Sequence, residues 1–142
     1  MPSRALLHLA AVVLPAAAAA VVLRNERPTV EYLLLCSAAI GAAQIAVLIG
    51  WRLFDSAARR GGLWRAVLAG VVMAVLTHLL FGPAMALCWA VAGQFPPDFV
   101  PFVLLLSFGS LIVMGVATVP AVVIVNLLLN RLRRKELLRV AV

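Results

Sequence analysis

The chain has 142 residues, of which 65% are apolar and only 12% charged, and its mean hydropathy is +1.15. Soluble domains are about 45–50% apolar and about 25% charged, so this chain has too little polar surface to cover a water-exposed fold of its size. The net charge of +7 does not indicate nucleic-acid binding, because the basic residues lie in short runs between long apolar stretches, a pattern typical of membrane orientation.

Four long apolar stretches follow in chain order, and they predict an all-α membrane protein built as a four-transmembrane-helix bundle. A helix needs about 20 residues to cross a hydrocarbon core of about 30 Å, and each stretch has at least 19. Helices are required because lipid offers the backbone no hydrogen-bond partners, and the strands of a barrel would alternate in polarity. We expect a single transmembrane domain over residues 1–142, with helices at about 5–23, 32–51, 66–92 and 100–129.

The first stretch, 5–23, admits two interpretations. It follows Arg4 and contains an alanine run at 16–20 that a signal peptidase would accept, as in a cleaved signal peptide. A charged turn begins directly after Leu23, however, which is typical of a helix that stays in the protein. We therefore expect a retained transmembrane helix.

The basic residues predict that both termini lie in the cytoplasm. With four crossings, the N-terminal flank, the second loop and the tail share one side, which holds ten Lys and Arg residues, whereas the other side holds only Arg24 and Arg27. Positively charged flanks remain on the cytoplasmic side of a membrane. Because the chain is compact and rich in alanine and arginine, we expect a multi-pass protein of a bacterial inner membrane, with a basic, amphipathic cytoplasmic tail at 130–142.

Polar side chains at mid-depth are the candidates for function in a membrane protein. No Asp, Glu, Lys or Arg lies near the middle of a predicted helix, so the buried carboxylate on which small proton-coupled exporters depend is missing. His78, with Thr77 beside it, and Gln44 lie near the middle of their helices, within about 5 Å of the same depth at 1.5 Å per residue. We expect an intramembrane polar contact among Gln44, Thr77 and His78 that packs two helices together; a ligand or proton role of His78 is the alternative.

Two pairs of residues suggest specific sites: a haem held by two histidines and a disulfide between two cysteines. His8 and His78 would have to face each other across a flat ring to ligate haem, but they differ in depth by roughly 9 Å. Cys36 and Cys88 share a depth near the outer ends of their helices, so a disulfide is possible if these helices touch there. We expect neither a cofactor nor a metal, and two free thiols that pack as apolar side chains.

Small residues on one helix face and basic residues in the tail are the candidate contact surfaces. Ala39, Ala43 and Ala46 share a face of the second predicted helix, where small side chains allow close backbone approach. We expect this face to be central in the bundle or to meet a partner chain. In the tail, leucines alternate with five basic residues that would adsorb to anionic lipid or dock on a partner, namely Arg131, Arg133, Arg134, Lys135 and Arg139.

The sequence shows no nucleophile elbow, phosphate loop, metal-binding cluster or paired catalytic carboxylates, so we do not expect an enzyme. The first hypothesis is a non-enzymatic accessory or scaffolding subunit of a larger membrane complex, which contacts the lipid bilayer and other membrane subunits or further copies of itself. The alternative is a small oligomeric transporter, flippase or channel, because Pro15, Pro83 and Pro120 interrupt the hydrogen bonding of three predicted helices. A membrane-embedded enzyme ranks lowest.

Overall fold

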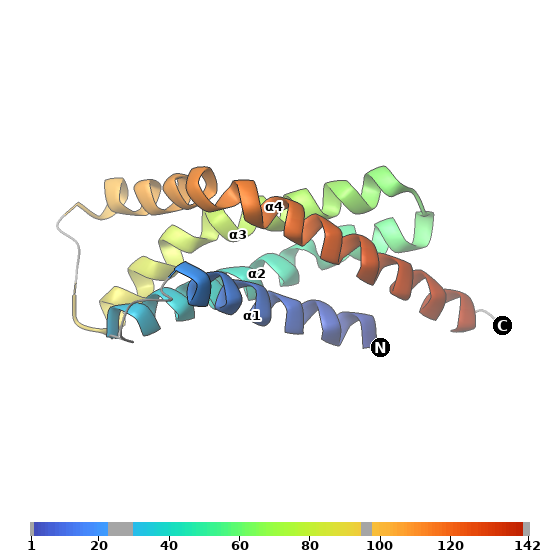
Figure 1. The fold of residues 1–142 in the computed structure, drawn as a ribbon, viewed down its shortest axis with the longest axis horizontal. Coiled ribbons are helices and arrows are strands. Elements are labelled where there is room, and N and C mark those ends of the chain that lie inside the picture. Colours follow the sequence, from blue (N-terminus) through green and yellow to red (C-terminus); the bar gives the residue numbers. More distant parts are fainter. Residues whose placement is uncertain (1, 23–29, 95–97, 141–142) are drawn as a thin grey trace.

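The computed structural model describes residues 2–22, 30–94 and 98–140, and these form four α-helices (Figure 1). They are α1 (Pro2–Val22), α2 (Val30–Arg60), α3 (Leu63–Val91) and α4 (Phe99–Val140). All four are long and apolar enough to cross a membrane, which confirms the all-helical prediction. Leu23, Arg24, Arg27 and the last two residues of the expected tail lie outside the described residues.

The helices extend beyond the apolar stretches that predicted them. α2 has 31 residues and continues to Arg60, and α4 has 42 residues and continues to Val140. Hydropathy marks where a helix can meet lipid, whereas its backbone hydrogen bonds continue into polar sequence until a residue stops them. Most of the expected second loop and the described part of the tail are therefore helical.

The turn between α2 and α3 consists of two glycines. Gly61 and Gly62 have φ values of 68° and 117°, in the left-handed region that residues with a Cβ rarely adopt. Gly61 ends α2 with a hydrogen bond from its N–H to the carbonyl of Ala57. This short connection makes α2 and α3 neighbouring antiparallel helices.

The N-terminus, the α2–α3 turn and the C-terminus lie at one end of the bundle (Figure 1). We call this the basic end, because helix segments that carry ten basic residues meet there. These residues are Arg4, Arg52, Arg59, Arg60, Arg65, Arg131, Arg133, Arg134, Lys135 and Arg139.

Small side chains dominate the centre of the bundle. On α2, Ala42 and Ala46 are fully buried, Ala43 is nearly so, and Ala39 is half-buried. Two faces of α2 are thus buried in helix contacts, since α2 packs against both α1 and α3. Larger apolar side chains pack with Ala11 and Ala43 in a cluster towards the basic end; they are Leu7, Val47, Phe54 and Met73.

Glycines let α4 lie directly on α3. A Cβ at Gly70 would stand 2.9 Å from the Cα of Val123, and a Cβ at Gly82 would meet the backbone oxygen of Val103 and the hydroxyl of Ser107. Backbones this close are possible only where one helix has no side chain. The opposite side of α4 is apolar and exposed; Ile112, Val113 and Val116 are each more than 70% accessible.

Candidate functional site

The structure divides the predicted Gln44–Thr77–His78 contact between different helix pairs. His78 is buried between α3 and α4, where its Nδ1 lies 3.1 Å from the Ser110 hydroxyl and its Nε2 lies 2.6 Å from the Thr118 hydroxyl. Thr77 donates instead to the carbonyl of Met73 within its own helix, at 2.9 Å. A helix places residues 77 and 78 about 100° apart around its axis, so the neighbours point to different surroundings.

Both hydroxyls beside His78 also lie within hydrogen-bonding distance of carbonyls of their own helix. Ser110 Oγ is 2.9 Å from the Ser107 oxygen, and Thr118 Oγ1 is 3.0 Å from the Met114 oxygen. A neutral imidazole donates one hydrogen bond and accepts one. One hydroxyl therefore accepts from the ring while the other donates to it, and both ring nitrogens are used in joining α3 to α4.

Gln44 joins α2 to α1. Its Oε1 lies 2.8 Å from His8 Nδ1, and its Nε2 donates to the carbonyl oxygen of His8 at 2.9 Å. The predicted contact between Gln44 and His78 is therefore wrong. The two residues were expected at the same depth, but they lie on helix faces that meet different neighbouring helices. The two imidazoles, considered above as haem ligands, are likewise held in separate contacts, and Cys36 and Cys88 are free thiols.

Pro83 explains a further contact between α3 and α4. Proline has no N–H, so the carbonyl of Leu79, four residues earlier, loses its usual helical partner. The Ser107 hydroxyl donates to this carbonyl at 2.9 Å, and the absence of a side chain at Gly82 brings it close enough to do so. The proline that the sequence indicated as an interruption is thus compensated by the neighbouring helix.

Asn126 and Asn130 form two contacts that were not predicted. The side-chain amide of Asn126 donates to the Ala66 carbonyl at 2.6 Å, and that of Asn130 donates to the Phe54 carbonyl at 3.2 Å. Together with Arg133 they occur at spacings of four and three, which places all three on one helix face. The sequence therefore contained a signal for these contacts, because three polar residues on one helix face indicate that this face of α4 turns into the bundle.

Arg133 is the centre of an ionic network at the basic end. Its guanidinium lies 2.9 Å from the Asp55 carboxylate, 3.3 Å from the Glu136 carboxylate and 5.6 Å from the centre of the Trp51 ring. Arg133 is only 3% exposed, and the two carboxylates compensate its loss of hydration. The prediction that all five basic tail residues face lipid or a partner is therefore wrong for Arg133, because helical periodicity turns this position towards α2.

The same network holds the start of α1. Glu136 accepts hydrogen bonds from the backbone N–H of Ser3 at 2.9 Å and from its hydroxyl at 2.7 Å. The first N–H groups of a helix have no partner within it, and a carboxylate there is also favoured by the helix dipole. Arg4 adds a contact 5.0 Å from the centre of the Trp51 ring, so α1, α2 and α4 meet through charged side chains.

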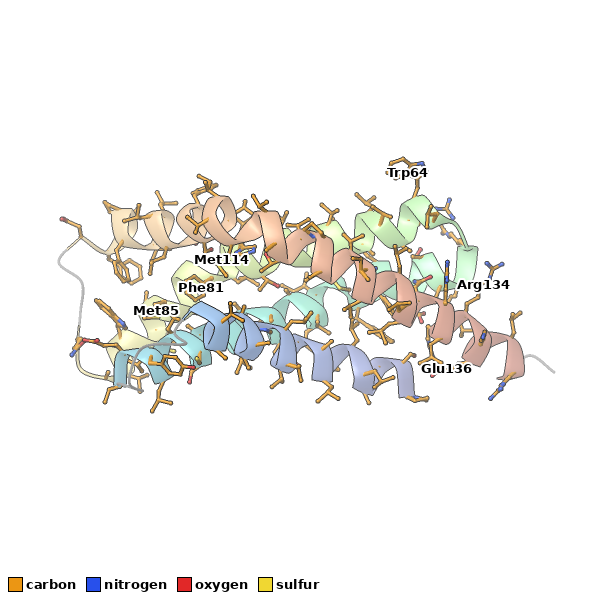
Figure 2. All side chains as sticks on the ribbon, viewed as in Figure 1. Trp64, Phe81, Met85, Met114, Arg134 and Glu136 are labelled. Carbon is orange, nitrogen blue, oxygen red and sulfur yellow. The ribbon has the colours of Figure 1, made fainter. Side chains whose placement is uncertain are left out.

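The other basic residues of the predicted tail are exposed on α4. They are Arg131, Arg134, Lys135 and Arg139. The guanidinium of Arg134 lies beside Gly61 in the α2–α3 turn, and Figure 2 shows Arg134 and Glu136 towards the same end of the bundle as Trp64. Next to the network, an open hollow of about 320 Å³ lies along the last turns of α2; it is lined by Trp51, Arg52, Asp55, Ser56, Arg59 and Arg60.

No three His, Cys, Asp or Glu residues in the described part of the chain lie close enough together to hold a metal ion. In comparisons with protein families, with curated proteins and with solved structures, the chain matches none of them.

Proposed function

We propose that the four helices insert into a bacterial inner membrane with the basic end, and hence both termini, in the cytoplasm. Ten basic residues at one end of an apolar bundle support this orientation, since positively charged flanks stay on the cytoplasmic side. Exposed apolar side chains along α4 then face lipid or another membrane protein.

Within that membrane, we propose that the chain is a non-enzymatic accessory or scaffolding subunit of a larger complex. The observation that carries this proposal is that the mid-helix polar groups bond to one another: His78 to Ser110 and Thr118, and Gln44 to His8. Side chains used in this way hold helices in place. The outer face of α4, which includes Ile112, Val113 and Val116, is the surface on which a partner subunit would pack.

Purification in a mild detergent followed by mass spectrometry tests this role. An accessory subunit should co-purify with other membrane proteins in a fixed ratio. Val116→Trp, on the outer face of α4, should reduce that co-purification several-fold, whereas Leu9→Trp, at an exposed apolar position of α1, should leave it unchanged. Recovery of only a stable homo-oligomer would contradict the proposal.

A small oligomeric transporter is the second candidate, and it rests on the prolines within α1, α3 and α4 and on the mid-helix position of His78. In that case His78→Ala should abolish a flux across reconstituted vesicles while the protein still assembles. Unchanged flux would remove His78 from the transport mechanism.

A further inference from the structure

The hollow at the basic end contains positive charge that is not compensated. Asp55, its one acidic lining residue, is paired with Arg59 at 2.7 Å and with Arg133 at 2.9 Å. Arg52 and Arg60 are exposed, and neither forms an ion pair with any residue that the structure describes. The hollow is therefore suited to an anion.

The arrangement of the lining side chains favours a phosphate group. Arg52, Ser56 and Arg60 follow one another at intervals of four, so one face of α2 presents a guanidinium, a hydroxyl and a second guanidinium. Guanidinium groups bind phosphate oxygens through paired N–H donors, and a serine hydroxyl supplies a further donor. These donors lie where α2 continues as a helix past its apolar stretch, which ends near Trp51.

The depth of the hollow indicates where the phosphate comes from. With the apolar part of α2 in the hydrocarbon core, the residues after Trp51 reach the layer of lipid headgroups, where indole rings are also enriched. Lipid phosphate is abundant at that depth. We propose that Arg52, Ser56 and Arg60 bind the phosphate of an anionic phospholipid headgroup; this rests on the proposed membrane placement and not on the accessory role.

Two variants with equal loss of charge separate a binding site from general attraction to the membrane. Arg52→Gln/Arg60→Gln removes both arginines from the hollow, whereas Arg65→Gln/Arg139→Gln removes two exposed arginines elsewhere at the basic end. Each protein is reconstituted in phosphatidylcholine vesicles that contain phosphatidylglycerol and is then extracted for native mass spectrometry. The measurement is the amount of phosphatidylglycerol that stays bound, with and without inorganic phosphate.

We expect the hollow variant to retain on the order of tenfold less phosphatidylglycerol than the control variant, since both variants lose the same general attraction to anionic lipid, whereas only the hollow variant loses the two guanidinium groups that contact the phosphate. Ser56→Ala should reduce retention less, and inorganic phosphate should not displace the lipid. Equal retention by the two arginine variants would overturn the proposal, and displacement by inorganic phosphate would assign the hollow to a soluble phosphate instead. Extraction of the unaltered protein from the vesicles by alkali would contradict the membrane placement itself, which is a different failure.

Discussion

The interface between α3 and α4 and the interface of α1 with its neighbours are formed by different kinds of residue. α3 meets α4 through Gly70 and Gly82, which let backbones touch, and through short hydroxyl side chains around His78. α1 buries the stripe Ser3, Leu7, Ala11 and Ala19 and is joined by longer side chains such as Gln44 and Glu136. The difference indicates that the α3–α4 pair tolerates little change, whereas α1 is attached at a few separate points.

Gly82→Ala, at the α3–α4 interface, should lower the stability of the protein more than any other substitution considered below. The added Cβ would meet the Val103 backbone, which cannot move aside like a flexible side chain, so we expect the free energy of unfolding to fall by about 3 kcal/mol, the upper part of the range for overpacking. Reversible denaturation by dodecyl sulfate in mixed micelles, followed by circular dichroism, measures this change.

Gly41→Ala is the matched control, because a Cβ at Gly41 has no neighbour within 4 Å. It should leave stability unchanged or raise it by about 0.5 kcal/mol, since alanine favours a helix more than glycine does. If Gly82→Ala behaved like Gly41→Ala, the close approach of α3 and α4 would be disproved.

Gln44→Leu should weaken the attachment of α1 and leave α3 and α4 together. It removes two hydrogen bonds to His8, and at about 0.6 kcal/mol for each bond in a membrane the loss should be about 1 kcal/mol. In a variant without native cysteines, a cysteine at the buried position Ala11 should then react faster with a thiol reagent.

Thr77→Val is the control for Gln44→Leu, because the Thr77 hydroxyl donates within α3, to Met73, and to no other residue that the structure describes. It should change stability by less than about 0.5 kcal/mol and leave the labelling of residue 11 unaltered. Equal labelling in the two variants would show that Gln44 does not hold α1.

Ser107→Ala should have the smallest effect and should depend on Pro83. In the unaltered background it leaves the Leu79 carbonyl without this partner and should cost about 0.6 kcal/mol, the value for one hydrogen bond in a membrane. With Pro83→Ala the helix supplies its own N–H to that carbonyl, so the cost of Ser107→Ala should fall towards zero. A double-mutant cycle measures this coupling, and equal costs in both backgrounds would contradict it.

The position of a polar side chain along its helix could be predicted from the sequence, but its direction around the helix axis could not. Gln44 and His78 were expected to meet because they share a depth, yet Gln44 bonds to α1 and His78 to α4. The sequence partly indicated that Arg133 points into the bundle, since Asn126 and Asn130 precede it on the same helix face. Its carboxylate partners are 78 and 3 residues away in the chain, and only packing brings the more distant one, Asp55, next to it.

The sequence by itself determined that the chain forms four apolar helices and that basic residues gather at one end, because both follow from composition along the chain and from the need of the backbone for internal hydrogen bonds. Only the tertiary structure decided which polar groups pair, how far α2 and α4 extend, and which basic residues stay exposed. The physical reason is that polar pairing and exposure depend on how each helix is rotated about its axis against its neighbours. That rotation is set by close contacts of glycines and alanines, and hydropathy along the chain does not predict those contacts.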